Sequence, residues 1–548
     1  MDGVSRVVAG LVEEFVADDP VLATVLGRRE GLDALPSYSA AAMKHRVAIA
    51  RRGIDTLAPF AATGVGDRPP TAEAAEAAVF LPALRRLVRS FDLRRVHETS
   101  PRYYLDRAYE ALMPLMVRDL APEDERVRAL GARLRALPGL LEEARANLAP
   151  GLPRIFVENG IQMAEGLAEL AGTAAREFAA GIQRAGALDA PSVTAVEALA
   201  AFREYLRERL LPASVDGCAA GRAVVEDILI YEHMLTETPE EIAAVGRTLI
   251  AESQAAMKEL ASAMGFADTD AAVAATRTVH PAAGDLVPAY RRAVAAARDY
   301  LVEHDLVTLA EGEELAVAAT PPCLRSVLPF AAYDPPGPFA ARQLGYYYVT
   351  PPPAGDAGAL AAHPSASLPT TGVHEAYPGH HVQLTRANRA ASPARRLAGL
   401  FEGGNLLVEG WAFYCEEMME RQGFLASPEV RLMRLNDQVW RACRVVIDAE
   451  VATGRTSFAE AVSTLAREAR MDPRLAELEV RWYVESPGTP MSYLLGKREV
   501  MALSRAFGRT RSASLKTFHD ALLDWGCVSP RLIAWGLGLG ERPAAYAA

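Results

Sequence analysis

The sequence predicts a mainly helical protein with a small β-sheet. Of its 548 residues, 50% are hydrophobic and 23% are charged, a balance that is ordinary for a globular protein with a large core. Long segments carry apolar residues at three- and four-residue spacing between charged ones, which is typical of amphipathic helices. Residues 345–350 instead have the aromatic and β-branched composition of a strand.

Helical periodicity covers most of the chain before residue 320 and returns near the C-terminus. Two helix starts carry capping residues: Thr238 precedes a proline and two acids, and Ser457 lies three residues before Glu460. We expect helices over residues 73–96, 121–148, 160–187, 193–211, 237–264, 285–304 and 428–452.

The composition changes between residues 320 and 370, where proline, glycine and aromatic residues replace helix formers. The strand expected here has two interpretations: an edge strand whose backbone pairs with an extended substrate, or a structural hairpin whose tyrosines pack on helices. We expect residues 1–320 to form a helical body and residues 321–548 to carry the strand, the histidine-rich segment at 374–381, the EGWA segment at 409–412 and the C-terminal helices. The two regions are expected to form one continuous unit.

Charge and targeting features exclude several classes of partner. The net charge of −11 argues against a nucleic-acid or anionic-membrane surface. No stretch reaches the roughly 20 apolar residues of a membrane helix, and acids among the first twenty residues argue against a secretory signal. Scattered cysteines without a C-x-x-C pair predict reduced thiols in a cytoplasmic protein; they are Cys218, Cys323, Cys415, Cys443 and Cys527. The oligomeric state stays open.

The segment HEAYPGHH, which begins at His374, concentrates three of the ten histidines beside a glutamate. An H-E-x-x-H helix presents two imidazoles to zinc one turn apart, but here Pro378 stands where the second histidine would be. In an unbroken helix His381 would lie about 10 Å further along the axis than His374, too far for one zinc. The proline and the glycine after it allow a helix that bulges by two residues and brings His380 to the second ligand position. His381 remains the alternative ligand.

A third ligand is expected from the amphipathic run NLLVEGWAFYCEE at residues 405–417. Glu409 would complete a set of two histidines and one glutamate, which leaves a fourth position for water. Glu416 lies one heptad later on the same face, so we expect it to orient one of the histidines. These ligand types predict Zn²⁺, and another divalent ion could use the same set.

Other residues near these motifs have expected roles in catalysis. Glu375 is placed to take a proton from the attacking water. The oxyanion that follows needs a donor, for which Tyr493 is the first choice. Tyr347 and Tyr348 of the expected strand are alternative donors and candidate substrate-binding residues.

Two basic residues and one cysteine have both a functional and a structural interpretation. Arg444 and Lys497 could bind a substrate carboxylate or form structural ion pairs. Cys415, next to Glu416, fits a buried apolar position better than a catalytic nucleophile.

The histidine block and the EGWA block together resemble the bacterial DUF885 family, whose members resemble gluzincin-type zinc metallopeptidases and carboxypeptidases. The segments PRYYLDR at 101–107, LGARLRALPGLLEEARANL at 130–148 and PGTPMSYLLGK at 487–497 extend the resemblance over most of the chain. The resemblance implies a large helical gluzincin-like fold with a small sheet beside the metal-binding helix.

Three positions depart from the pattern of that family. Ala452, Thr489 and Leu494 stand where a histidine, a glutamine and a lysine are usual. The expected metal ligands are kept while these polar positions change, so the departures concern the substrate and the reaction more than the metal.

The expected function is that of a zinc-dependent hydrolase that cleaves a peptide or peptide-like amide bond in a short substrate, with Glu375 as general base. One alternative is an enzyme of the same fold in a biosynthetic pathway, acting on a non-peptide amide or as a lyase. A second alternative is a non-catalytic binding protein with a degenerate site.

Overall fold

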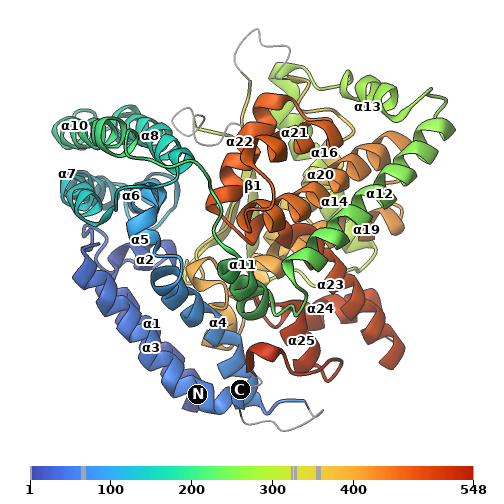
Figure 1. The fold of residues 1–548 in the computed structure, drawn as a ribbon, viewed down its shortest axis with the longest axis horizontal. Helices are drawn as coiled ribbons and strands as arrows, with labels where there is room; N and C mark the ends of the chain where they lie inside the picture. The colour runs from blue at the N-terminus through green and yellow to red at the C-terminus, as the bar shows by residue number, and fades with distance from the viewer. Residues whose placement is uncertain are drawn as a thin grey trace.

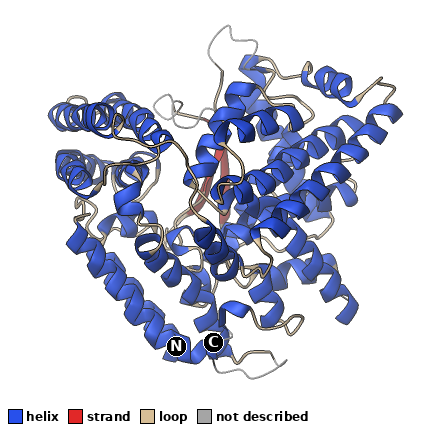
Figure 2. Cartoon of the chain, viewed as in Figure 1, coloured by secondary structure: helices blue, strands red, loops and turns tan. Residues whose placement is uncertain are grey.

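Helices form most of the molecule, and a small sheet lies among them. The computed structural model describes residues 3–62, 69–321, 325, 330–352, 360–511 and 513–546. Figure 2 shows the strands at the centre of the view, surrounded by helices. The prediction of a mainly helical protein with a small sheet is confirmed.

The N-terminal part is a set of packed helices, drawn from blue to green in Figure 1. Apolar residues from Tyr104 to Leu210, with Leu32 and Tyr38, form a separate core, whereas the buried residues between Val4 and Val16 and between Ala75 and Leu84 belong to the largest core. The helices are α1 (Gly3–Asp18), α2 (Pro20–Val25), α3 (Ala40–Ala62), α4 (Ala72–Asp92), α5 (Val96–Thr99), α6 (Pro101–Val117), α7 (Glu123–Asn147), α8 (Arg154–Glu169), α9 (Ala175–Gly181), α10 (Asp189–Tyr205) and α11 (Arg222–Ile228). Three π-helical turns interrupt them at Leu170–Ala174, Leu206–Leu210 and Leu229–His233.

The C-terminal part contains the long helix pairs that carry the candidate site. Helix α12 (Pro239–Ala263) packs along α20 (Pro428–Ala452), and α19 (Asn405–Arg421) packs along α23 (Thr489–Thr510). Helix α14 (Leu286–Glu303) packs against α16 (Leu368–Glu375). The other helices are α13 (Thr269–Arg277), α17 (His380–Asn388), α18 (Pro393–Arg396), α21 (Phe458–Glu468), α22 (Pro473–Glu485), α24 (Leu515–Leu523) and α25 (Pro530–Gly536).

The helices expected from periodicity are confirmed, with small shifts at their ends. The expected helix 160–187 is a continuous run of α8, a π turn and α9, and the expected helix 193–211 lies within α10 and the π turn that follows it. Both capping boxes form: the side chains of Thr238 and Ser457 accept hydrogen bonds from the backbone amides of Glu241 and Glu460.

The sheet has three strands in the order β1-β3-β2, where β1 is Glu313–Ala319, β2 is Ala331–Asp334 and β3 is Gln343–Val349. Strand β3 pairs in parallel with β1 and antiparallel with β2, so both of its edges are used. The predicted strand is confirmed. Its interpretation as an edge strand that binds a substrate backbone is wrong, because β3 is the central strand.

The largest hydrophobic core joins both ends of the chain. It includes Val4 and Tyr546, and the hydroxyl of Tyr546 donates a hydrogen bond to the carbonyl of Ala78 at 2.6 Å. Figure 1 shows the N and C marks close together. The expected boundary at residue 320 falls between β1 and β3, so it crosses both the sheet and this core.

The sequence predicted reduced cysteines and no membrane-spanning helix. Four cysteines are free thiols, namely Cys218, Cys415, Cys443 and Cys527, while Cys323 lies outside the described residues. Cys415 is buried, and burial raises the pKa of its thiol. No helix in the described ranges is both long and apolar enough to span a membrane.

Candidate metal centre

The histidine block folds as two helices rather than as one bulged helix. Helix α16 ends at Glu375 and α17 begins at His380, and the link between them contains a cis peptide bond before Pro378. The amide of Gly379 donates to the carbonyl of Val373 at 3.0 Å, and a Cβ at Gly379 would lie 1.8 Å from the carbonyl oxygen of His374. The prediction of a two-residue bulge is therefore wrong: the chain turns tightly back on the end of α16, and only glycine fits there.

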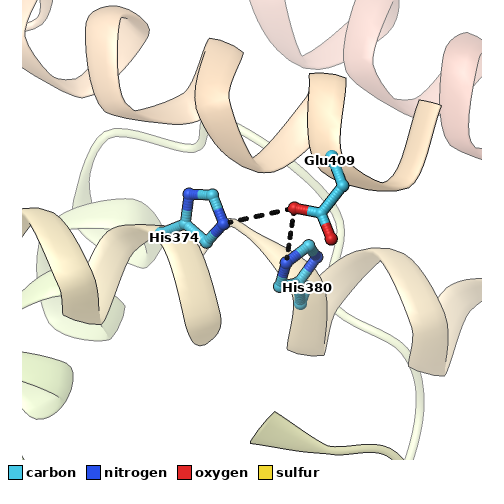
Figure 3. Close-up of side chains that lie close together, drawn as sticks. All are labelled: His374, His380 and Glu409. Atoms are coloured by element: carbon cyan, nitrogen blue, oxygen red, sulfur yellow. Dashed lines mark ion pairs between the residues drawn. The ribbon is translucent and has the colours of Figure 1, made fainter. Parts of the chain in front are cut away.

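This turn brings together His374, His380 and Glu409, which we call the metal cluster. One potential ligand atom from each residue lies within 4.8 Å of the others. Nε2 of each histidine is 3.6 Å from the same Glu409 oxygen, Oε2, as Figure 3 shows. Ligands bound tetrahedrally to zinc at about 2.1 Å are about 3.4 Å apart, so this spacing suits such an ion.

Unpaired atoms distinguish this cluster from an ordinary buried polar network. Glu409 Oε2 and His380 Nδ1 are buried and have no hydrogen-bond partner among the described residues. Buried polar atoms are nearly always paired, so an orphaned carboxylate oxygen facing two imidazoles calls for an explanation. A divalent cation would satisfy the donor set of two histidines and one glutamate.

Glu416 orients one of the two candidate histidine ligands. His374 Nδ1 donates to Glu416 Oε1 at 2.8 Å, which leaves Nε2 free to face Glu409. Burial opposes protonation of His374, but the carboxylates of Glu409 and Glu416 raise its pKa to about 10. Burial also opposes ionisation of Glu409, but the imidazoles of His380 and His374 lower the pKa of its carboxyl. The expected role of Glu416 agrees with this geometry.

His381 turns away from the metal cluster, toward the sheet. Its Nε2 lies 2.5 Å from Glu313 Oε2 on β1, and its Nδ1 lies 2.9 Å from the hydroxyl of Tyr333 on β2. The hydroxyl of Tyr377 donates to the same Glu313 oxygen at 2.8 Å. We call His381, Glu313, Tyr333 and Tyr377 the sheet cluster. Both ring nitrogens of His381 are occupied there, so of the two candidates it is His380 that faces Glu409.

Two glycines set the position of Glu409 and Tyr493. A Cβ at Gly410 would lie 2.4 Å from the carbonyl carbon of Gly496, and a Cβ at Gly496 would lie 1.9 Å from the carbonyl oxygen of Leu406. Helices α19 and α23 therefore cross with their backbones in contact, which larger residues would prevent. The crossing places Tyr493 beside His374, with the two rings nearly parallel at 14° and their centroids 6.3 Å apart.

Glu375 lies among tyrosines at the end of α16. It is partly exposed, and its charge contributes to the raised pKa values of Tyr290, Tyr347 and Tyr493, for each of which burial is the main cause. Tyr347 is fully buried, and its hydroxyl finds no hydrogen-bond partner in the described part of the chain. Tyr290 was not expected from the sequence, since no local motif marks a tyrosine inside an amphipathic helix.

Tyr348 and Lys497 lie away from the ligand atoms. Tyr348 follows Tyr347 on β3 and so points to the opposite face, where its ring stacks on that of Tyr346 at 5.5 Å. Lys497 Nζ is 2.6 Å from Glu417 Oε2 and donates to Gln438 Oε1 at 2.6 Å. Burial lowers the pKa of Lys497 despite its partner Glu417. This environment favours the structural interpretation of Lys497.

Arg444 lies beside Tyr493, with its Cζ atom 4.6 Å from the ring centroid. Its Nε donates to the hydroxyl of Tyr483 at 3.0 Å and its Nη2 to Glu479 at 2.8 Å. Neighbouring charges and hydroxyls raise its pKa against the effect of burial. Arg444 is therefore both structurally paired and adjacent to the candidate site.

The positions that depart from the family pattern are structural in this chain. Ala452 and Leu494 are buried in one apolar cluster, which also contains Phe413. Thr489 begins α23, and its hydroxyl accepts a hydrogen bond from Asn405 at 3.3 Å. Ala452 and Leu494, at two positions where the resemblance implied polar residues, therefore serve packing in the same apolar region.

Comparison with known proteins supports the family and the fold. The model of the family described as "Bacterial protein of unknown function (DUF885)" matches residues 20–535. A "putative lipoprotein of unknown function" from Shewanella oneidensis has a TM-score of 0.77 at 18% identity, covering 97% of this chain and 99% of that one. A "putative lipoprotein" from Colwellia psychrerythraea has a TM-score of 0.79 at 17% identity, covering 98% of both chains.

Identities this low show a shared fold and do not extend to activity. None of the curated proteins matches the chain. The expected cytoplasmic location stays a prediction, and the family match over most of the residues gives the one firm assignment. The protein belongs to the DUF885 family.

Proposed function

We propose that the protein is a metal-dependent hydrolase with a gluzincin-like centre that cleaves a peptide-like amide bond in a short substrate. The observation that carries this proposal is the convergence of His374, His380 and Glu409 on one point, beside Glu375. Three protein ligands leave a fourth position for water, as catalytic zinc sites require and structural sites do not. When bound, Zn²⁺ supplies a water of lowered pKa and polarises a substrate carbonyl.

Glu375 is the proposed general base. It follows the ligand His374 directly and stays partly exposed, while the ligand atoms around it are buried. Its carboxylate would accept the proton of the attacking water and deliver it to the leaving amine. Tyr290 and Tyr347 lie close enough to this carboxylate for its charge to raise the pKa of their hydroxyls further, beyond the main effect of burial.

Tyr493 is the proposed donor to the oxyanion. Its ring is held between His374 on one side and Arg444 on the other, so its hydroxyl has a restricted position. Burial raises the pKa of this hydroxyl, so it stays protonated at neutral pH and can donate a hydrogen bond. A donor fixed before the reaction stabilises developing charge without reorganisation.

The test combines metal content with turnover. The purified protein, loaded with Zn²⁺, should hold one ion and hydrolyse members of a panel of short peptides and N-acyl amino acids. Glu375→Gln should keep the zinc and lose about 10²–10⁴-fold in kcat.

Other outcomes of this test would favour the alternatives. Bound zinc with no turnover of the panel would favour a non-peptide amide or a lyase reaction. A protein that holds no zinc and turns over no substrate would favour the non-catalytic binding protein, whereas activity that survives Glu375→Gln would contradict the role of Glu375 as general base.

A further inference from the structure

Helix α20 carries two arginines, Arg441 and Arg444, one turn apart and beside the metal cluster. Arg444 Cζ lies 4.6 Å from the ring centroid of Tyr493, and Arg441 Cζ lies 5.8 Å from that of Phe413. Each of these rings has its centroid 6.3 Å from that of His374. Arg444 Cζ is therefore at most about 11 Å from the His374 ring, a length that about three extended residues cover.

The two guanidinium groups keep nitrogens without partners. Arg444 is 5% exposed; its Nε and Nη2 are paired, but its Nη1 has no hydrogen-bond partner within the described ranges. Arg441 has two such buried atoms, Nε and Nη1, of which Nη1 forms only a long ion pair with Asp437 Oδ1 at 3.8 Å. Buried donors are rarely left unpaired, and here three of them lie on adjacent turns of one helix.

Aromatic rings hold the Arg444 guanidinium without using its N–H groups. Its Cζ atom lies 4.6 Å from the ring centroid of Trp440, 5.2 Å from that of Trp482 and 5.5 Å from that of Tyr483. Contact with aromatic faces orients the planar group, and the two N–H groups of its Nη1 are the donors that remain available. A planar anion with two oxygens is the partner that such donors match.

The charges around the pair allow an additional anion. The acids that face it are Glu479, 2.8 Å from Arg444, and Asp437 beside Arg441. Burial raises the pKa of the Asp437 carboxyl, and of the charges near it Glu416 raises this pKa further while Arg441 and Arg277 lower it. Glu416 is itself paired with His374, so three arginines face the two remaining acids, and a ligand carboxylate would balance the excess.

We propose that Arg441 and Arg444 form the binding site for a free carboxylate of the substrate. The substrate class is then a short amide that carries a carboxylate close to the scissile bond, such as the C-terminal end of a small peptide or an N-acyl amino acid. The choice of scissile bond rests on the proposed function, whereas the carboxylate site can be tested without turnover.

Binding is measured first, on zinc-loaded Glu375→Gln protein, with an N-acetyl dipeptide as the free acid and as the C-terminal amide. Trp440 and Trp482 flank Arg444, so tryptophan fluorescence reports occupancy. The free acid should bind about tenfold or more tightly than the amide, and adding Arg444→Gln or Arg441→Gln should remove that difference. Equal binding of acid and amide, or no binding of the acid, would overturn the inference.

Turnover provides the second measurement. In the otherwise unchanged protein, Arg444→Gln should raise KM for the free acid about ten- to a hundredfold, with little change for the amide, and Arg444→Lys should restore part of the difference. Arg434→Gln is the matched control, because this buried arginine of the same helix is paired with Glu420. It should leave the acid-to-amide ratio unchanged.

The two measurements separate the two proposals. A preference for the free acid in binding, without turnover of any amide, would keep the carboxylate site and contradict the proposed hydrolase. Turnover of the free acid and the amide with equal KM would keep the proposed hydrolase and contradict the carboxylate site. Zinc content and thermal unfolding of each variant show whether the fold survives the substitution.

Discussion

The metal cluster and the sheet cluster both lie at the start of α17. The adjacent residues His380 and His381 belong to different clusters. In the metal cluster, His380 Nε2 faces Glu409 Oε2, and this oxygen lacks a hydrogen-bond partner among the described residues. His381 lies in the sheet cluster, where both ring nitrogens are paired. Histidine and glutamate therefore serve two purposes in this protein. In the sheet cluster their side chains pair with one another and hold the helix to the strands, whereas in the metal cluster an unpaired glutamate oxygen faces two imidazoles and can bind a ligand with them.

The sheet cluster also supports the metal cluster. It ties the first turn of α17 to both edge strands, β1 and β2, through Glu313 and Tyr333. That turn also carries His380, so the contacts of His381 help to fix its direction. The comparison therefore predicts that substitutions in the two clusters affect different quantities.

Replacing the adjacent histidines should give the largest contrast. His380→Ala removes a metal ligand, so the protein should fail to retain zinc on dialysis and lose all measurable turnover. His381→Ala leaves the ligands in place and should lower the melting temperature while zinc stays bound. Metal analysis and a thermal melt of each variant test this, and loss of zinc in His381→Ala alone would reverse the assignment of the two residues.

Tyr493→Phe should have the next largest effect. It removes the proposed oxyanion donor and keeps the ring between His374 and Arg444, so kcat should fall about 10²–10³-fold with little change in zinc content. Tyr348→Phe is the control, because Tyr348 lies on the other face of β3. Equal rates for Tyr493→Phe and the unchanged enzyme would remove this tyrosine from the mechanism.

Glu416→Gln should weaken zinc binding without abolishing it. The carboxylate that orients His374 becomes a neutral amide, and the affinity for zinc should fall about 10- to 100-fold. Glu313→Gln makes the same chemical change in the sheet cluster and should leave zinc affinity near that of the unchanged protein. Competition with a chromophoric chelator measures both variants, and equal losses in both would contradict the division into two clusters.

The affinity for zinc should also depend on pH, with the smallest change for each step of one pH unit. Without metal, Glu409 and Glu416 raise the pKa of His374 to about 10, so at neutral pH the imidazole carries a proton that zinc must displace. Zinc affinity should therefore rise about tenfold per pH unit from about pH 6 to 8. Calorimetry in buffers of different ionisation enthalpy should detect the released proton, and an affinity that is flat over this range would contradict the raised pKa.

The sequence by itself determined the helices and the identity of the candidate ligands. Periodicity and capping residues act locally, so α12, α20, the N-cap at Thr238 and the capping box at Ser457 followed from neighbouring residues. The density of histidines at 374–381 and the glutamate of EGWA also pointed to a His, His, Glu set, because ligand chemistry depends on residue type.

Only the tertiary structure decided which histidine faces Glu409 and where the strand lies in the sheet. The choice between His380 and His381 depends on a tight turn at Gly379 and on Glu313, which is distant in sequence. The central position of β3 depends on pairing with β1 and β2. The proximity of Arg441 and Arg444 to His374 is visible only in the structure, where the rings of Phe413 and Tyr493 lie between them. The physical reason is common to all three: contacts between distant segments leave no periodic or local signal in the chain.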